Sequence, residues 1–576
     1  MKNITKKTLE ILNRKDKKNI LLAILLLIIK TIFDVLSIGL IIPILHFSSS
    51  NNEKSFLTEY IPFLDQVNKM QTIVFFVSIF LFVYLIKTVF IIYYNRWSTK
   101  LLNILAADLS RKVLEKYLKN DYMFFLENNS AHIIRNVSSE TTVFASGFIG
   151  NVILTVTQIF FIIAVCSFLV ILNPYSIYVI LILASLNAII VISTNNKFKK
   201  WGLIRHEITA TFLKKLHELI GGIKEVILYN TKLSAIDDAH DQMKKLANSN
   251  INRDITLAFT APIIEFLGIL IFFSFFSVLI IYSSLSLNEV LVIFAVFAFS
   301  AIKLLPAIIS LVKSIQSIKF NAISVDVIHK ILNENKGFKV IKEKSETEKI
   351  NLKSLNFQNV SFKYSTQKEP TLSNLTFDIN KDDKIGIIGE TGSGKSTLLN
   401  LISSLINPTS GIIKINNSSE FNYTETIRNH IGYVSQSVYL SDESIFFNIA
   451  LGKDVSEEER NKIILILEKL NLGFINNQKV DVNSSLGERG VKLSGGQIQR
   501  IGIARALYRN PAILILDEAT NALDHHTEEK ILDYLFKTLK NQTLILCTHK
   551  KELLKYCNKI IEVKNNTINI KENKTN

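Results

Sequence analysis

Long apolar runs in residues 1–320 constrain the fold of this chain more than any other feature. Each run reaches the roughly twenty residues that a helix needs to cross a bilayer. Hydrophobic residues make up 48% of the chain and charged residues only 20%, so charged side chains must be concentrated elsewhere. The sequence therefore predicts a multidomain membrane protein that begins with an all-α transmembrane domain over 19–320. Its six helices are expected near residues 19–46, 71–95, 147–172, 175–195, 256–282 and 287–312.

Lysine and arginine predict the orientation of these helices, because short cytoplasmic loops carry an excess of both residues. Residues 1–18, 96–146 and 196–255 are rich in Lys and Arg, whereas 173–174 and 283–286 contain neither. We therefore expect the N-terminus, the long loops and the C-terminal domain to lie in the cytoplasm. Residues 1–18 are weakly amphipathic as well as basic, and they predict a helix at the membrane interface.

The formal net charge of +16 also arises from the basic segments beside the membrane helices. Much of this charge lies on loops that flank the membrane, where anionic lipid headgroups attract it. A basic balance can also indicate nucleic-acid binding. Because the charge follows the membrane topology, we expect membrane lipids as partners and no nucleic acid.

Four ionisable residues interrupt the apolar runs and are candidates for a substrate cavity. Asp34 lies in the first run, Lys87 in the second, Glu265 in the fifth and Lys303 in the sixth. Charged side chains inside a bilayer are costly, so they pair with one another or face a water-filled cavity. Two hypotheses stay open: the lysines pair with the acids or reach an interface, or the four residues line a cavity that holds an anionic headgroup.

The composition changes after residue 320. Residues 321–350 are polar and charged without an apolar period, which predicts a linker. Residues 351–576 alternate apolar strands with helical patterns, as is typical of an α/β domain.

A glycine-rich segment at 389–397 reads GETGSGKST and fits the pattern G-x-x-x-x-G-K-[ST]. An apolar strand precedes it and a helical pattern follows. The backbone N–H groups of such a loop cradle phosphates, with Lys395 on the β- and γ-phosphates and the Ser396 hydroxyl on Mg²⁺. The predicted ATP-binding residues are Gly389, Glu390, Thr391, Gly392, Ser393, Gly394, Lys395, Ser396 and Thr397.

The stretch 484–526 supplies the rest of a nucleotide site. It contains a Gly-Gly signature, an apolar strand over 513–516 and the carboxylate pair Asp517 and Glu518. Asp517 ends the strand and is expected to hold Mg²⁺, and Glu518 is the expected general base that activates water. These features predict a P-loop nucleotide hydrolase. The signature residues are Ser494, Gly495, Gly496 and Gln497.

With both motifs in this order and at this spacing, the chain resembles the ABC transporter family. The resemblance implies a homodimer in which the 389–397 loop of one subunit faces the signature of the other across ATP, with ATP and Mg²⁺ as cofactors. It also implies that Tyr364 stacks on adenine, that Gln436 reaches Mg²⁺ and the attacking water, and that His549 contacts the γ-phosphate. The turn at 521–524 is expected to contact the other subunit.

The short outer loops and long inner segments resemble the exporter-type membrane domain of that family. The resemblance implies membrane helices that continue into the cytoplasm, with turns near 120–130 and 220–232 in contact with ATPase domains. Residues 486–490 resemble the exporter-type segment before the signature, which favours export over import. No catalytic position is degenerate, which argues against an ATP-gated channel or regulator.

At lower specificity, the chain is similar to bacterial flippases of lipid-linked oligosaccharides used in protein glycosylation. The residues that carry this similarity lie at 33–35, 42–43, 87–94 and 303–306 and in the outer segment 47–70. It implies a polyprenyl-diphosphate-linked oligosaccharide as substrate, with a basic cavity for the diphosphate, and the bacterial inner membrane as location. A lipid A or phospholipid flippase, a peptide exporter and a multidrug exporter remain as alternatives.

Overall fold

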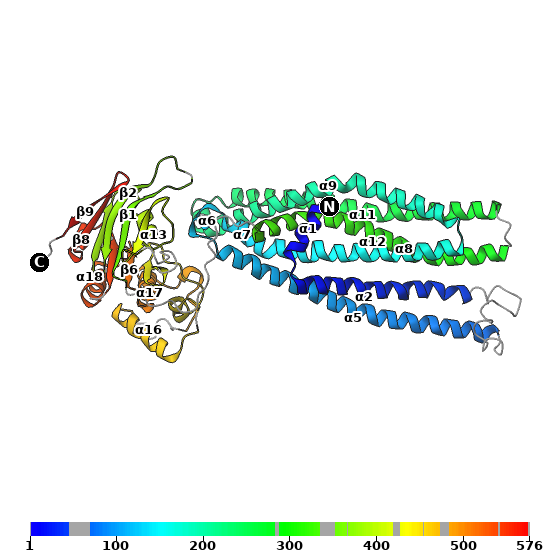
Figure 1. The fold of residues 1–576 in the computed structure, drawn as a ribbon, viewed down its shortest axis with the longest axis horizontal. Helices are drawn as coiled ribbons and strands as arrows, with labels where there is room; N and C mark the ends of the chain where they lie inside the picture. Colours follow the sequence, from blue (N-terminus) through cyan, green and yellow to red (C-terminus); the bar gives the residue numbers. More distant parts are fainter. Residues whose placement is uncertain are drawn as a thin grey trace. The chain divides into compact units, whose positions relative to one another are not determined.

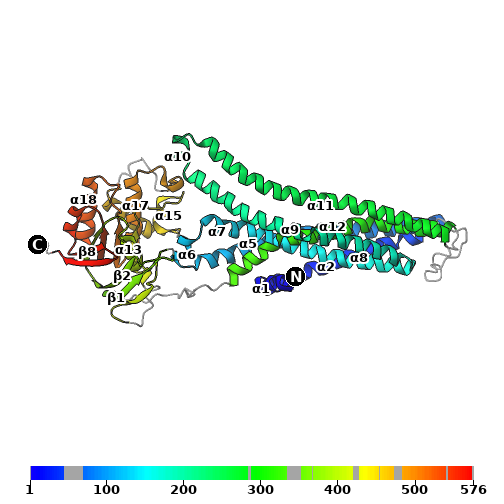
Figure 2. The ribbon, with the colours of Figure 1, turned by 90° about the horizontal axis from the view of Figure 1, so that it is seen from above.

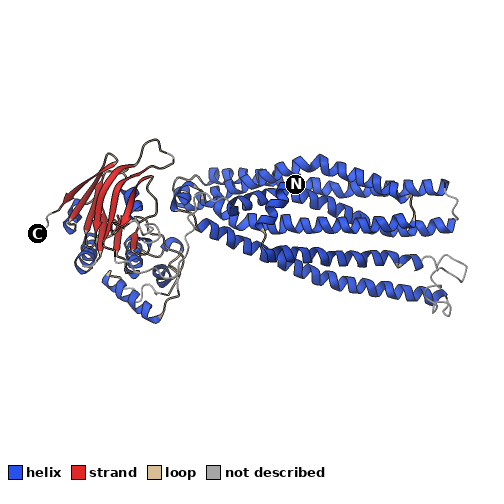
Figure 3. Cartoon of the chain, viewed as in Figure 1, coloured by secondary structure: helices blue, strands red, loops and turns tan. Residues whose placement is uncertain are grey.

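The computed structural model forms two compact units. The first comprises Met1–Asn120 and Phe125–Phe338, and the second comprises Asp121–Phe124 and Lys339–Asn576. In the part of the chain that the structure describes, every strand belongs to the second unit (Figure 3). The predicted outer segment 47–70 lies almost entirely outside this part. The described residues are 2–44, 69–282, 287–333, 352–365, 367–418, 427–452, 454–472, 483–539 and 542–573.

Long helices that run beside one another build the first unit (Figure 1). Six helices in the described residues are long and apolar enough to cross a membrane, so the prediction of a multi-pass membrane protein with six spans is confirmed. The helices are α1 (Lys2–Ile11), α2 (Arg14–Gly39), α5 (Lys69–Leu118), α6 (Tyr122–Glu127), α7 (Ser130–Arg135), α8 (Gly150–Leu172), α9 (Ser176–Gly221), α10 (Ile223–Leu228), α11 (Lys232–Tyr282) and α12 (Leu287–Asn333), with π-helical turns at Asn136–Glu140 and Val143–Ile149.

Several of these helices are much longer than a bilayer requires. Helix α9 has 46 residues, which corresponds to about 69 Å at 1.5 Å per residue. The hydrocarbon core is only about 30 Å thick, so α9 extends well beyond it. The short helix α10 then joins α9 to α11 within the predicted turn at 220–232 (Figure 2).

Two predicted boundaries in this unit are wrong. Helix α1 ends at Ile11 and α2 begins at Arg14, because the Asn13 backbone N–H donates to the Asp16 carboxylate and a new helix starts there. Helix α12 continues to Asn333, so residues 321–333 are helix and not linker. Val325 and Ile328 are fully buried, and their spacing of three continues the buried stripe of α12.

Small residues let the long helices pack closely. Helix α9 packs against α11 and α12. A Cβ atom at Gly202 of α9 would lie 2.1 Å from the Phe320 carbonyl oxygen of α12, and one at Gly268 of α11 would lie 2.4 Å from Leu305 of α12. Gly202 therefore marks a place where α9 approaches the backbone of α12 too closely for any side chain, whereas at Gly268 the obstacle is the end of the Leu305 side chain.

Two sheets form the centre of the second unit. One is antiparallel, in the order β2-β1-β4, and the other has the order β5-β6-β7-β3-β8-β9 and is parallel except for β9. The strands are β1 (Ser354–Phe362), β2 (Leu372–Asn380), β3 (Lys384–Gly389), β4 (Ser410–Ile415), β5 (Ile431–Val434), β6 (Ile513–Asp517), β7 (Thr543–Cys547), β8 (Lys559–Lys564) and β9 (Thr567–Glu572). The α/β fold predicted for this unit is confirmed.

Helices accompany the parallel strands, as strands buried on both faces require. The apolar stretch of β6 is almost completely buried. Because β5, β6, β7 and β3 are parallel neighbours, the residues that follow them gather at one edge of the sheet. The main helices are α13 (Lys395–Ile402), α15 (Ile445–Ala450), α16 (Glu457–Lys469), α17 (Gly495–Tyr508) and α18 (His525–Asp533).

Candidate functional site

The glycine-rich loop connects β3 to α13 and has the geometry of a phosphate cradle. Gly392 and Gly394 have φ angles of 83° and 104°, a left-handed backbone that glycine adopts without strain. The Lys395 ammonium donates to the carbonyl oxygens of Gly389 at 2.9 Å and Glu390 at 3.0 Å. The N-terminus of α13 adds a partial positive charge. The loop therefore offers the donors that a polyphosphate needs.

Tyr364 lies beside this loop. Its hydroxyl is 3.1 Å from the Thr397 hydroxyl, and its ring packs edge-on against Phe362 with a centroid distance of 4.8 Å. Stacking of the Tyr364 ring on adenine stays a prediction.

Three side chains converge on the carboxylate of Glu518. The side-chain amides of Gln436 and Asn521 donate to its Oε2 at 2.7 Å and 2.9 Å, and His549 Nε2 lies 3.0 Å from its Oε1. Glu518 itself has a φ of 50°, a left-handed backbone directly after the end of β6. The structure thus brings together the predicted base, Gln436 and His549.

Asn521 contacts Glu518, and this contact was not predicted from the sequence. The turn at 521–524 is expected to contact another subunit, and the Asn521 amide also donates to the carboxylate of Glu518. The spacing of three residues, with a turn between them, could have indicated this contact.

Asp517 lies next to Glu518 and accepts a hydrogen bond at 2.9 Å from the Tyr433 hydroxyl. Burial raises the pKa of the Asp517 carboxyl above its usual range, and the Tyr433 hydrogen bond opposes this shift. Burial also raises the pKa of the nearby Cys547 thiol to about 12, so this thiol is neutral. Tyr433 lies on β5 beside β6, a pairing that the sequence alone does not specify.

Because the raised pKa of Asp517 favours its neutral form, we expect the affinity for Mg²⁺ to fall as the pH decreases, beginning at a higher pH than for an ordinary aspartate. Only the charged carboxylate binds the metal well. The Mg²⁺ concentration that half-saturates ATP hydrolysis, measured across the neutral-to-acid range, tests this expectation.

Tyr433→Phe provides the comparison for that experiment. A hydrogen bond to a charged carboxylate favours the charged form, so its loss should move the pH dependence further toward neutral pH. Protonation of ATP affects both proteins equally. Identical pH dependence in the two proteins would contradict a role of Asp517 and Tyr433 in holding the metal.

The signature begins α17 and is attached to the turn after Glu518. Ser494 and Gln497 cap this helix reciprocally, with the Ser494 N–H 2.7 Å from Gln497 Oε1. A Cβ atom at Gly496 would lie 3.0 Å from the Ala522 carbonyl oxygen, so the glycine permits this close approach. Because Gly495 and Gly496 have no side chains, neither residue covers the positive N-terminal end of this 14-residue helix.

In the first unit, the structure separates Glu265 from the other three predicted cavity residues, which gather around Tyr84. The Lys87 ammonium donates to the Asp34 carboxylate, and each side chain is only 8% exposed. The ammonium groups of Lys87 and Lys303 lie 4.8 Å and 5.2 Å from the centre of the Tyr84 ring. Within the described ranges, no ion pair involves Lys303 or Glu265. Of the four residues, only Lys87 and Asp34 therefore form the ion pair that the first hypothesis predicts.

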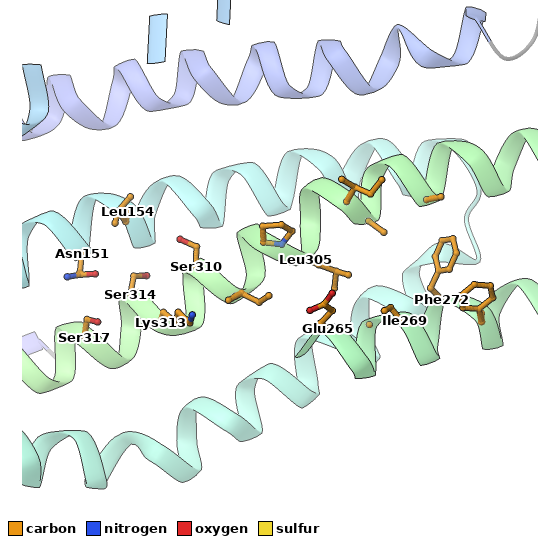
Figure 4. Close-up of a pocket in the computed structure, with 17 residues that line it drawn as sticks. Asn151, Leu154, Glu265, Ile269, Phe272, Leu305, Ser310, Lys313, Ser314 and Ser317 are labelled. Carbon is orange, nitrogen blue, oxygen red and sulfur yellow. The ribbon is translucent and has the colours of Figure 1, made fainter. Parts of the chain in front are cut away.

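Glu265 lines a cavity of about 860 Å³ between α8, α11 and α12 (Figure 4). Lys87, Asp34 and Lys303 do not line it. Lys313, which does, was missed in the sequence because it follows the last apolar run. The other polar lining residues are Asn151, Ser310, Ser314 and Ser317, and the apolar ones include Leu154, Ile269, Phe272, Phe273 and Ile309.

Two family models match this chain, one in each unit. The family model described as "ABC transporter transmembrane region" matches residues 20–302, and the model described as "ABC transporter" matches residues 372–521. The ATP-dependent lipid A-core flippase 2 of Colwellia psychrerythraea is 26% identical over 469 residues, 79% of this chain and 77% of the relative. A match of this length includes parts of both units.

Other relatives match over a shorter length. A Bacillus subtilis protein named for multidrug export is 40% identical over 215 residues, 37% of either chain. The alpha-hemolysin translocation ATP-binding protein of Escherichia coli O157:H7 is 40% identical over 219 residues, 37% of this chain and 30% of the relative. The chain thus spans less than two fifths of the length of these relatives.

Among solved structures, a bacterial Atm1-family ABC exporter with ATP bound has a similar fold. The TM-score is 0.77 at 18% identity, and the alignment covers 96% of this chain and 94% of the other. At this identity the likeness concerns the fold alone.

Proposed function

The chain is an ABC exporter half-transporter, with one membrane unit fused to one ATPase unit, and on this premise we propose that two copies hydrolyse ATP to move an amphipathic lipid across the bacterial inner membrane. The convergence of Gln436, His549 and the carboxylate of Glu518 supports the hydrolytic step. The transported substrate is inferred from the cavity in the membrane unit.

The residues of the nucleotide site divide the chemistry among them. Lys395 leaves the carbonyl oxygens that it now contacts and binds the phosphates. Glu518 accepts the proton of the attacking water, and Gln436 and His549 orient its carboxylate. Ser396, Gln436 and Asp517 offer the oxygen atoms that would hold Mg²⁺, which neutralises phosphate charge when bound.

Two features support a dimer. Each chain carries one phosphate loop and one signature, and the signature begins a helix whose N-terminus suits a phosphate of the partner's nucleotide. The segment around α10 also exposes large apolar side chains, which a second copy would cover. They are Ile223 at 47%, Ile227 at 53%, Leu228 at 68% and Tyr229 at 76% exposed.

The polarity of the 860 Å³ cavity carries the proposal for the substrate. Along α12, the lining residues from Ala298 to Ile309 are almost all apolar, and those from Ser310 to Ser317 are serines and a lysine. A molecule that fits this wall has an apolar chain and a polar headgroup. The ammonium of Lys313 suits a phosphate. Lipid A and phospholipids have this chemistry, and lipid A-core flippases are among the relatives that match 79% or more of the chain.

A second candidate is the polyprenyl-diphosphate-linked oligosaccharide, which Lys303 favours. Asp34 neutralises Lys87, whereas the nearby Lys303 ammonium over the Tyr84 ring has no carboxylate partner among the described residues. An unbalanced cation at membrane depth needs an anion, and a diphosphate supplies two negative groups. This candidate would bind beside Tyr84 and not on Lys313.

We expect purified protein in nanodiscs to hydrolyse ATP faster when lipid A or a polyprenyl-diphosphate glycan is added, and a hydrophobic peptide to have no effect. Lys313→Gln should raise the half-stimulating concentration of lipid A by roughly ten- to a hundredfold, because a hydrogen bond to a charged group contributes about 1.5–3 kcal/mol. Lys303→Gln should do the same for the glycan alone.

Lys319→Gln removes a cation from α12 outside the cavity lining and serves as the control. Glu518→Gln provides the blank without hydrolysis. Stimulation by the peptide alone would contradict a lipid substrate. Stimulation by one of the two lipids would decide between the candidates.

A further inference from the structure

Two charged side chains of opposite sign line the same cavity without forming an ion pair. Figure 4 shows Glu265 on α11 and Lys313 on α12. No ion pair within 4.0 Å joins them or involves either one in the described part of the chain. Charged residues at membrane depth are usually paired, so a ligand that carries both charges would satisfy the two residues at once.

The packing of α11 on α12 fixes the relative depth of the two charges. The helices meet where Gly268 faces Leu305, and Ile264 packs against Ile308 and Val312. They therefore run antiparallel, and Glu265 and Lys313 lie on the same side of the contact. At 1.5 Å per residue, Glu265 is about 4.5 Å and Lys313 about 12 Å from the level of Gly268. The backbone levels of the two residues are thus about 7.5 Å apart along the helices, within the reach of their side chains and a small headgroup.

Hydroxyl groups surround the cation. Ser310 and Ser317 lie one helical turn before and after Lys313, and their hydroxyls form no hydrogen bond with any described residue. Ser314, by contrast, is engaged with the Thr155 hydroxyl at 2.7 Å and with the Leu311 carbonyl oxygen at 2.9 Å. The two serines lie about 10.5 Å apart along the helix, so a phosphate on Lys313 reaches one of these hydroxyls and not both. Ser310 lies on the Glu265 side of Lys313, and this ammonium and hydroxyl together are a donor set for a phosphate.

The surroundings of Glu265 differ from those of Lys313. Ile269, Phe272 and Phe273 follow Glu265 along the same face of α11 and line the apolar part of the cavity. A carboxylate in this position accepts hydrogen bonds and donates none. Its complement in a ligand is an ammonium group. An apolar chain joined to a phosphate on Lys313 passes Glu265 to reach these aromatic side chains, so the amine folds back from the phosphate toward α11.

We propose that this cavity binds a zwitterionic amphiphile, with its phosphate on Lys313 and the hydroxyl of Ser310 and its amine on Glu265. The inference rests on the proposed function, because it names the headgroup of the lipid that the transporter moves. In this arrangement α12 binds the anionic group of the ligand and α11 binds its cationic group.

The test compares headgroups that differ in one charge. Hydrolysis of ATP is measured in nanodiscs of a neutral carrier lipid, with added phosphatidylethanolamine, phosphatidylglycerol or diacylglycerol. We expect phosphatidylethanolamine to stimulate most. Glu265→Gln should lower the ratio of stimulation by phosphatidylethanolamine to stimulation by phosphatidylglycerol at least about fivefold. A change of about 1 kcal/mol in binding free energy produces a factor of this size. Lys313→Gln should remove the advantage of both phospholipids over diacylglycerol.

Matched controls separate recognition of the headgroup from general damage. Glu207→Gln changes an exposed carboxylate of α9, and Lys319→Gln changes a cation of α12, both outside the cavity lining. If Glu265→Gln leaves the ratio of the two phospholipids unchanged while both still stimulate, the zwitterion inference is overturned and the lipid transporter stands. If no lipid stimulates the wild-type protein, the proposed function fails instead.

Discussion

Replacement of Glu518 by glutamine is expected to slow ATP hydrolysis by roughly two to four orders of magnitude, the usual contribution of general acid–base catalysis. Glutamine has nearly the same shape but cannot accept the proton of the attacking water. The residues that bind the phosphates are unchanged, so ATP binding should be retained. Phosphate release and ATP binding, measured separately on the purified protein, test both parts of this expectation.

Glu552→Gln is the control, because Glu552 is an exposed carboxylate of the same unit with no contact to the nucleotide site among the described residues. Its rate should equal that of the wild-type protein. Wild-type hydrolysis by Glu518→Gln would mean that another group accepts the proton. Loss of ATP binding in the variant would mean that Glu518 acts in the structure of the site and not in the chemical step.

Gly202→Ala should destabilise the membrane unit strongly. The added Cβ would lie 2.1 Å from the Phe320 carbonyl oxygen, and that oxygen belongs to the backbone of α12 and cannot rotate away. The two helices must therefore separate along their contact. Overpacking of this kind costs about 1–3 kcal/mol or more. A lower melting temperature of the purified protein in detergent, with a lower yield of folded protein, is the expected result.

Gly221→Ala provides the matched comparison on the same helix. A Cβ atom at Gly221, the last residue of α9, would meet nothing within 4 Å, so the added methyl group meets no steric obstacle there. This variant should be as stable as the wild-type protein. Equal melting temperatures for the two variants would show that α9 and α12 are not in the close contact described.

Local sequence patterns identified residues that the structure places at one edge of the parallel sheet. The glycine-rich loop, the carboxylate pair, Gln436 and His549 were assigned from short motifs, and parallel strands then bring Glu518, Gln436 and His549 together. The contact of Tyr433 with Asp517 could not be assigned in this way, because it depends on which strands are neighbours. Strand order is a property of the whole sheet.

The membrane unit was predicted in outline but not in detail. Length and apolarity identify the helices, but they do not give the rotation of each helix about its axis. The sequence therefore left open whether the four charged residues form pairs or line one cavity. In the structure Lys87 pairs with Asp34, and of the four only Glu265 lines the cavity of about 860 Å³. Lys87 and Asp34 are 53 residues apart, and no local pattern indicates that they form a pair.

The buried ion pair between Lys87 and Asp34 also restricts how the nascent chain enters the membrane. A charge in the middle of an isolated membrane helix costs about 2.5–3.5 kcal/mol during insertion. Asp34 therefore makes α2 a weaker insertion segment than its apolar residues indicate, and Lys87 does the same for α5. Together they form a hairpin whose charges cancel. The first two membrane helices should thus leave the translocation machinery as a pair, after α5 has been synthesised.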